Sequence, residues 1–384
     1  MRELNIEQQV PLNVLPEYVP EGRSTTDADR TGSDTAGRNN ISPENLTARD
    51  LAIAAAFKMP DAAIRLIDFF FTEDDRSFIE KYTGKEIPAS EIDEEYRKSA
   101  FSRGVISKVD PEGERYTLND FYGMLDVFSV SQTYKYHTLS RSTRKELDDW
   151  YFGQYMQGLD PDLTKRPTAD RVLSLEEMEE FIDGLKRPLF WSFCDCKSLS
   201  GDCGLPSHTC ISYAPGINSF AARGCSEEIT AEEAKEIVRK ADKAGLVHTV
   251  SDHGICNCCD DCCYLFRGQK VRNSVGFWPA SPHIIEFDAK KCVACGKCLT
   301  RCHFKVFAME ASAGNSAATS TTAPAGSSAA TSTTAAPASR NATSAPAKRT
   351  LALTRANCIG CGLCANTCPT GALKLGNRIG YEEL

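Results

Sequence analysis

The fold of this chain is decided by two similar segments, FDAKKCVACGKCLTRCHFKVFAME (287–310) and LTRANCIGCGLCANTCPTGALKL (353–375). Each segment spaces its cysteines as C-x2-C-x2-C-x3-C. The residues concerned are Cys292, Cys295, Cys298, Cys302, Cys358, Cys361, Cys364 and Cys368. An internal repeat of thiols at this spacing is a strong and specific signal. It predicts a domain in which both segments fold together.

The chain has 18 cysteines in 384 residues, and they all lie in tight groups between positions 194 and 368. A disulfide framework is typical of small secreted chains, whereas this chain is large and its N-terminus has no apolar signal core. Buried apolar thiols would be scattered along the sequence. Crowded thiolates repel one another, and a cation relieves that repulsion. Metal or iron–sulfur ligation is therefore the first interpretation.

The spacing of the repeat suits a cubane cluster, because each of its four irons binds one thiolate. Two intervening residues let a tight loop present three thiolates to three corners. The small residues in these loops let backbone N–H groups approach an anionic cluster; they are Ala294, Gly296, Gly360 and Gly362. Two structural zinc sites are the alternative, but paired C-x2-C zinc ligands do not require the third cysteine and the offset fourth.

On these motifs the chain resembles the bacterial two-cluster [4Fe–4S] ferredoxins over residues 286–308 and 351–375. In that family the last cysteine of each motif binds the other cluster. The resemblance implies one cluster on Cys292, Cys295, Cys298 and Cys368, and another on Cys358, Cys361, Cys364 and Cys302. The chain departs from the family where His303, and not proline, follows Cys302, and where a long insert separates the motifs. Loop-closure cost rises by only about 0.6 kcal/mol per doubling of loop length, so the domain tolerates the insert.

Other cysteines lie in FCDCKSLSGDCGLPSHTC (193–210), at Cys225, and in ICNCCDDCC (255–263). We expect at least one further iron–sulfur cluster, held jointly by the first and last of these groups. Adjacent cysteines point in different directions, so one member of each doublet ligates while the other packs or serves another site. A zinc site and a redox-active thiol pair are alternatives, and His208 and His253 are expected to be solvated loop residues. The candidate ligands are Cys194, Cys196, Cys203, Cys210, Cys256, Cys258, Cys259, Cys262 and Cys263.

The rest of the chain predicts an α+β protein. We expect a disordered tail over 1–47, a winged-helix-like domain over 48–136, a helical connector over 137–190, a Cys-rich region over 191–275, and the dicluster domain over 276–384 with a flexible insert over 311–349. The winged-helix prediction depends on helices followed by a hairpin around DPEGE (110–114). As a whole, the chain is similar to a group of ferredoxin-type proteins of anaerobes that combine these parts.

Composition limits the function. A net charge of −8 argues against a chain built to bind nucleic acid. No stretch approaches the ~20 apolar residues of a membrane span, and we expect a cytoplasmic protein. Without a flavin or nicotinamide fingerprint, hydride chemistry belongs to a partner. We therefore predict an oxygen-sensitive electron-transfer component that relays single electrons through two [4Fe–4S] clusters and a further cluster to a partner redox protein or oxidoreductase. A redox-sensing winged-helix regulator and a catalytic iron–sulfur reductase using the Cys-rich site are the alternatives.

Overall fold

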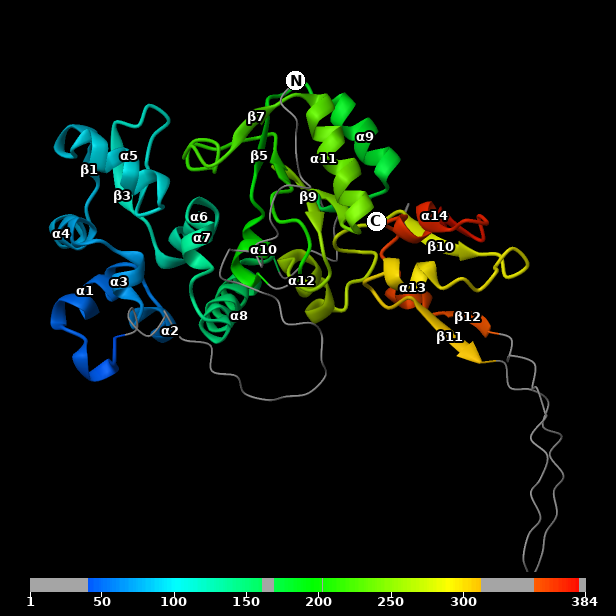
Figure 1. Ribbon diagram of the computed structural model, residues 1–384. Helices are drawn as coiled ribbons and strands as arrows, with labels where there is room; N and C mark the ends of the chain where they lie inside the picture. The colour runs from blue at the N-terminus through cyan, green and yellow to red at the C-terminus, as the bar shows by residue number, and fades with distance from the viewer. Residues whose placement is uncertain (1–40, 161–168, 202, 312–348, 380–384) are drawn as a thin grey trace, which may run out of the picture.

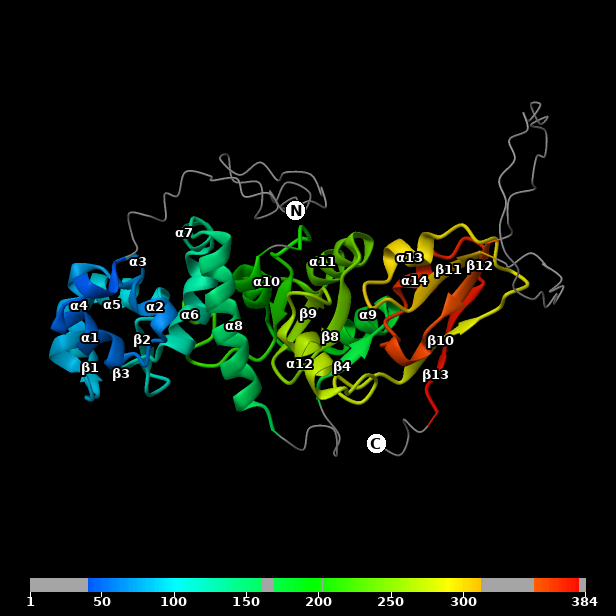
Figure 2. The same ribbon diagram turned by 90° about the horizontal axis from the view of Figure 1, so that it is seen from below.

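The computed structural model describes residues 41–160, 169–201, 203–311 and 349–379. Three bodies follow one another in a row: a mostly helical N-terminal body, a middle body built on one sheet, and a small C-terminal body (Figures 1 and 2). Of the tail predicted over 1–47, residues 1–40 lie outside the described residues, as does the insert over 312–348. Residues 41–47 differ from the prediction, because they contain the 3-10 helix Pro43–Asn45 and the N-cap Thr47 of the first helix. Among the described residues, every helix is too short or too polar to cross a lipid bilayer.

The N-terminal body begins with short capped helices. Thr47 and Thr72 each cap a helix by accepting from the backbone N–H three residues later, and Asp50 and Asp75 complete the two capping boxes. The helices are α1 (Ala48–Ala56), α2 (Asp61–Ile64), α3 (Ile67–Phe70), α4 (Glu73–Tyr82) and α5 (Glu94–Ser102). Their apolar faces meet in one core that includes the fully buried Phe57, Leu66 and Ile79.

A small antiparallel sheet completes this body, in the order β1-β3-β2. Its strands are β1 (Ile87–Pro88), β2 (Ile106–Lys108) and β3 (Arg115–Leu118). The predicted hairpin is present, since β2 pairs with β3 and the Asp110 carboxylate accepts from the backbone N–H groups of Glu114 and Arg115 across the turn. The assignment of this body to the winged-helix class stays a prediction.

Three helices carry the chain from the N-terminal body to the middle body. They are α6 (Phe121–Ser131), α7 (Thr133–Tyr136) and α8 (Arg141–Gly158). Aromatic rings join α6 and α8: Tyr122 stacks on Tyr151 at 4.3 Å between ring centroids, and Tyr151 stacks on Tyr264 of the middle body at 5.2 Å. These three aromatic residues therefore belong to the core, whereas Tyr134 of α7 is exposed.

The middle body is a six-stranded antiparallel sheet in the order β4-β8-β9-β6-β5-β7. Its strands are β4 (Arg171–Leu173), β5 (Leu189–Ser192), β6 (Cys210–Ser212), β7 (Glu227–Ile229), β8 (Val247–Val250) and β9 (Gly254–Cys258). The segment predicted as a helical connector, 137–190, differs from that prediction, because it supplies β4 and the start of β5. A three-residue strand is too short to leave a periodic pattern in the sequence.

Helices cover both faces of this sheet. On one face lie α9 (Leu175–Gly184) and α11 (Ala231–Ala244), which share a core with Trp191, Ile211 and Ile255 of the strands (Figure 1). Side chains alternate between the two faces along each strand, and those that point to the other face, such as Val172 and Val247, pack against Phe266 of α12 (Tyr264–Arg272). The short helix α10 (Asp195–Ser200) follows β5 and contacts α6 and α8.

The C-terminal body interleaves the two cysteine segments. Its strands and helices are β10 (His283–Phe287), α13 (Lys297–Arg301), β11 (Phe307–Ala311), β12 (Arg349–Leu353), α14 (Leu363–Thr367) and β13 (Leu373–Asn377). The first strand, β10, pairs with the last, β13, while β11 pairs with β12. Because each segment lends strands to a pair completed by the other, neither half forms its sheet alone.

Candidate metal centres

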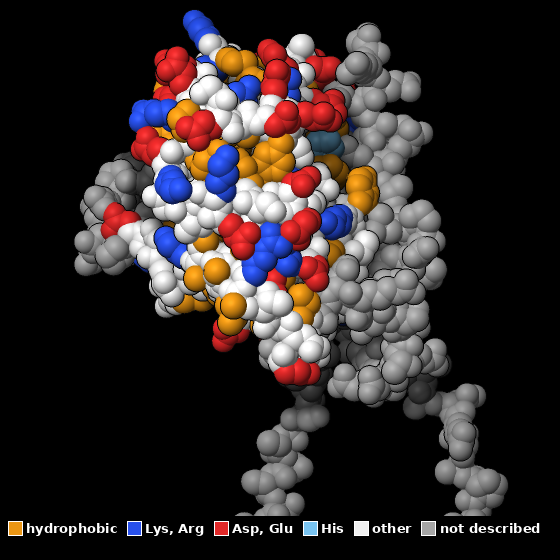
Figure 3. All heavy atoms as spheres, turned by 90° about the vertical axis from the view of Figure 1, so that its left-hand side faces the viewer, with side chains coloured by type: hydrophobic (Ala, Val, Ile, Leu, Met, Phe, Trp, Pro, Cys, Tyr) orange, Lys and Arg blue, Asp and Glu red, His pale blue; other side chains and the backbone are white. Residues whose placement is uncertain are grey.

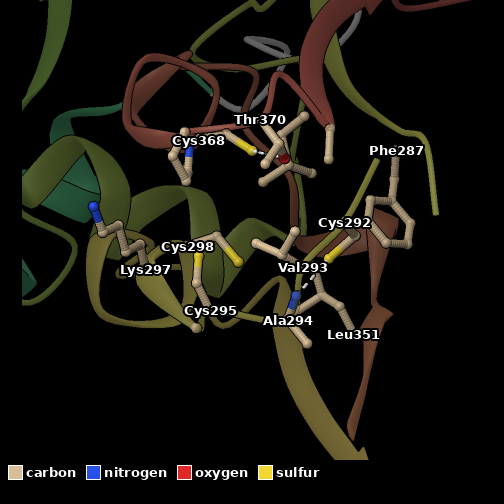
Figure 4. A pocket seen from close by; sticks show the side chains of 14 residues that line it. Phe287, Cys292, Val293, Ala294, Cys295, Lys297, Cys298, Leu351, Cys368 and Thr370 are labelled. Carbon is tan, nitrogen blue, oxygen red and sulfur yellow. Dashed lines mark hydrogen bonds between the residues drawn. The ribbon is translucent and has the colours of Figure 1, made fainter. Parts of the chain in front are cut away.

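One hollow of the C-terminal body is lined by the thiols of Cys292, Cys295, Cys298 and Cys368 (Figure 4). The first three come from the loop and the helix α13 of the first segment, and Cys368 comes from the end of α14 in the second. Figure 4 shows these four side chains facing one another across the hollow. The backbone N–H of Ala294 donates to Cys292 Sγ at 3.4 Å.

A second hollow is lined by the thiols of Cys302, Cys358, Cys361 and Cys364. Like the first hollow, it is lined by four thiols together with apolar side chains. Each hollow thus combines three thiols of one segment with the last thiol of the other. Burial raises the pKa of Cys361 to about 12, so this thiol needs a cation beside it to exist as a thiolate near neutral pH.

In each segment, the loop that carries the first three thiols contains residues with positive φ, in the left-handed region of backbone conformation. Gly360 and Gly362 have φ of 69° and 81°, and Ala294 and Gly296 occupy the same positions of the first segment with φ of 52° and 77°. A Cβ atom at Gly360 would lie only 2.2 Å from the carbonyl oxygen of His283, so this position requires glycine.

The cysteines of the middle body divide into two groups, and six of them form a closed ring. Around the ring each thiol lies beside the next and shifts its pKa, in the order Cys194, Cys196, Cys263, Cys258, Cys256, Cys210 and back to Cys194. Cys263 Sγ donates to Cys258 Sγ at 3.3 Å. The ring forms where α10 and α12 begin and where β6 and β9 lie side by side. We call this set the thiol ring.

The second group contains the thiols of Cys203, Cys259 and Cys262 with the carboxylate of Asp261. One donor atom from each of these residues lies within 4.8 Å of all the others. We call this set the three-thiol site. The doublets of the sequence are shared between the groups: Cys258 and Cys263 belong to the thiol ring, while their neighbours Cys259 and Cys262 belong to the three-thiol site.

A buried cation lies between these two groups. Lys197 is 2% exposed, and its Nζ donates to the carbonyl oxygen of Asn257 and, at 3.5 Å, to Thr209 Oγ1. Burial alone would lower the pKa of Lys197, but thiolates of both groups hold it well above its ordinary value; they are Cys194, Cys259, Cys258 and Cys210. Sequence reasoning missed Lys197, although its place directly after the C-x-C motif is a signal for such a residue.

The remaining candidate residues lie apart from both groups. The Cys225 thiol donates to the carbonyl oxygen of Ser102 in the N-terminal body at 3.7 Å. His253 is exposed, as expected. His208 differs from the predicted solvated loop residue, because its ring stacks on those of Trp191 and Phe193 at 3.7 and 4.5 Å and burial lowers its pKa to about 4.

The second hollow lies against the thiol ring. Cys258 and Cys263 of the ring share one hydrophobic core with Phe266, and with Ile359 and Leu363 that flank the second hollow. Cys361, which lines that hollow, packs against the same core. The C-terminal body therefore presents its second hollow, and not its first, to the Cys-rich side of the middle sheet.

Polar contacts fix this arrangement. His303 Nε2 donates to the carbonyl oxygen of Gly245 at 3.1 Å, and Arg301 Nη1 donates to that of Lys243 at 2.9 Å, so both residues bind the end of α11. His283 Nε2 lies 2.7 Å from Glu177 Oε1 at the start of α9. His303, which replaces the proline of the family pattern, thus joins two bodies of the chain.

Comparison with known proteins agrees with this geometry. Residues 291–372 match the family model of the 4Fe-4S dicluster domain. The chain is also 29% identical over 89 residues to Ferredoxin-3 of Rhodobacter capsulatus, across 23% of this chain and 75% of that ferredoxin. No solved structure matches the chain. The C-terminal body is therefore a ferredoxin-like dicluster domain, which implies two [4Fe–4S] clusters, and the predicted mixture of helix and sheet ending in such a domain is confirmed.

Proposed function

We propose that the chain relays single electrons along three iron–sulfur centres. The observation that carries the proposal is the shared core between the dicluster domain and the thiol ring. The outer cluster is bound by Cys292, Cys295, Cys298 and Cys368, and the inner cluster by Cys358, Cys361, Cys364 and Cys302. Iron–sulfur clusters supply one-electron chemistry at potentials that the protein sets. The chain contributes the thiolates, buries Cys358 and Cys364 of the inner site and holds that site against the thiol ring.

The thiol ring is the third centre in this proposal. Six thiols converge from two segments of the chain, and only cations offset the repulsion that they would feel as thiolates. The positive charge of Lys197 beside four thiols of the two groups supports an anionic centre at this place. A [4Fe–4S] cubane uses four thiolates. The ring therefore has enough ligands for a cluster that is bound jointly by 194–210 and 256–263.

Electrons enter or leave through the outer cluster. Cys295 is an exposed residue of that site, and Val293 beside it is 63% exposed. Lys290, Lys291 and Lys297 are exposed around the same loop. The partner that fits this surface is a redox protein with an acidic patch, because opposite charges steer two proteins together.

The proposal does not extend to DNA binding by the N-terminal body. Arg103 forms an ion pair with the buried Asp75, and Arg76 forms one with Asp50, both at 2.7 Å. Acidic and basic side chains are interspersed on the face of this body that Figure 3 shows. Such a surface lacks the dense positive charge that the phosphate backbone selects.

Metal and sulfide analysis of anaerobically purified protein tests the three-centre proposal. The two cubanes of the dicluster domain account for about eight irons per chain. We expect more than that, with acid-labile sulfide in proportion, and a fall to about eight in the double variant Cys194→Ser, Cys258→Ser. A wild-type protein that already contains only about eight irons would contradict the third centre while leaving the dicluster domain intact.

A further inference from the structure

We propose that Cys203, Cys259, Cys262 and Asp261 form a separate site for a single thiophilic divalent cation, with zinc as its occupant. Three thiolates and one carboxylate are a tetrahedral donor set of the kind that zinc binds. The site lies outside the dicluster domain and the thiol ring, so it does not depend on the electron-relay proposal.

The spacing of the donor atoms suits one ion. All four donors lie within 4.8 Å of one another. A tetrahedral ion with Zn–S bonds of about 2.3 Å holds its thiolates about 3.8 Å apart. The dicluster thiols provide an internal comparison, because among the described residues no three of them meet within 4.8 Å, and they surround a hollow. The three-thiol site is thus narrower than the cluster sites of the same chain.

The thiol ring does not share this shape. Within the described residues, the convergent donor group at the ring contains two thiols, those of Cys194 and Cys210, with the carboxylate of Asp195. The three thiols of Cys203, Cys259 and Cys262, in contrast, all lie within 4.8 Å of one another. A triangle of mutually contacting thiols has one centre, and a single ion bound there touches all three.

As thiolates, these donors need a cation beside them. Cys259 and Cys262 are 1% and 3% exposed, and burying several anionic donors together is costly unless positive charge compensates them. Lys197 supplies one positive charge beside Cys259. A divalent ion supplies most of the remaining positive charge that these anionic donors need, and it keeps the thiols deprotonated.

The carboxylate is the exchangeable ligand of the site. The backbone N–H of Cys262 donates to Asp261 Oδ1 at 2.9 Å, which orients the carboxylate beside the thiols. Asp261 itself is exposed, whereas Cys259 and Cys262 are buried. Zinc sites whose fourth ligand is replaceable from solvent are those that bind small molecules, whereas closed sites are structural.

The experiment compares zinc binding in the wild-type chain, Asp261→Asn and Cys203→Ser, with Asp260→Asn as the matched control. Asp260 is the neighbouring residue, but its carboxylate forms an ion pair with Lys270 Nζ at 3.0 Å. We expect one zinc per wild-type chain, with X-ray absorption showing three sulfurs at about 2.3 Å and one oxygen at about 2.0–2.2 Å.

Asp261→Asn should weaken zinc retention against a chelator at least about tenfold, and Cys203→Ser should abolish it, while iron content stays unchanged in both. Asp260→Asn should match the wild type. Absence of zinc from the wild type, a loss of iron in Cys203→Ser, or equal zinc retention in Asp261→Asn and Asp260→Asn would overturn the proposal. Asp261 is a surface residue, so its variant remains informative even if Cys203→Ser fails to fold.

Discussion

The ring of Phe266 packs edge-on against the ring of Phe304, with 5.0 Å between centroids and 75° between ring planes. Phe266 lies in the first turn of α12, shortly after Cys263 of the thiol ring, and Phe304 follows Cys302 of the second hollow. The contact therefore joins the segment of one centre to the segment of the next. It also holds the dicluster domain on the middle body.

Replacing Phe266 with alanine should loosen this junction. The side chain is fully buried, and truncation of a buried phenylalanine costs about 3–5 kcal/mol. We expect a lower denaturation midpoint for the anaerobic holoprotein and faster proteolysis between the two bodies. Phe277→Ala is the control, since Phe277 is 49% exposed and its truncation should change the midpoint little. Equal midpoints for both variants would show that the aromatic contact does not join the bodies.

The last cysteine of each segment is expected to bind the cluster that is held by the other segment. Cys368→Ala should destroy the outer cluster, whose other ligands lie in the first segment, and Cys302→Ala should destroy the inner one. Cys295 of the outer site is exposed, whereas Cys358 and Cys364 of the inner site are buried, so we expect the two clusters to differ in solvent access and to give distinguishable EPR signals. EPR of the reduced variants measures which signal disappears. If each alanine removes the cluster of its own segment, the assignment is wrong.

Lys197 should control how well the middle body retains metal. Its positive charge lies beside thiols of both the ring and the three-thiol site. Lys197→Met keeps the length of the side chain and removes the charge, so we expect the loss of the middle-body metals with the dicluster irons retained. Iron and zinc analysis measures the effect. Lys145→Met, at an exposed lysine of α8, is the control and should retain all metals; full metal content in Lys197→Met would refute this role.

Acid should destabilise the middle body through His248. This residue donates from Nδ1 to Asn257 Oδ1 at 2.7 Å, and burial lowers its pKa from 6.5 to about 4. Because the folded pKa lies below the unfolded one, protonation favours unfolding, and stability falls as the pH drops from 6.5 towards 4. The expected loss is about 2 kcal/mol between about pH 7 and pH 5.

Chemical denaturation of the wild type and of His248→Gln at these two pH values measures the contribution. Glutamine can donate to Asn257 but does not titrate, so the variant should lose less stability on acidification. An identical pH dependence in both proteins would contradict the assignment of a neutral buried imidazole to this position.

The sequence was enough to predict the eight cluster-binding thiols of the dicluster domain, because their spacing is local and repeated. It also predicted that adjacent cysteines serve different sites, and Cys258 and Cys259 lie in different thiol groups. It did not predict which cysteines belong to which group, since that depends on how the starts of α10, α12 and β6 come together beside the end of β9. Asp261 was missed for the same reason, whereas Lys197 was missed although it directly follows the C-x-C motif. The interpretation of His303 as a departure from the family did not foresee that it binds Gly245 of another body.

EPR-monitored redox titration of the anaerobic chain, beside the variant Cys258→Ser, tests the electron relay most directly. The relay predicts that three EPR signals appear in the wild type as its clusters are reduced. The signal of the inner cluster should be magnetically broadened by the neighbouring cluster in the thiol ring. In Cys258→Ser the third signal and this broadening should both disappear, while the outer cluster titrates as before. Two signals in the wild type, unchanged in shape and potential by Cys258→Ser, would contradict the account.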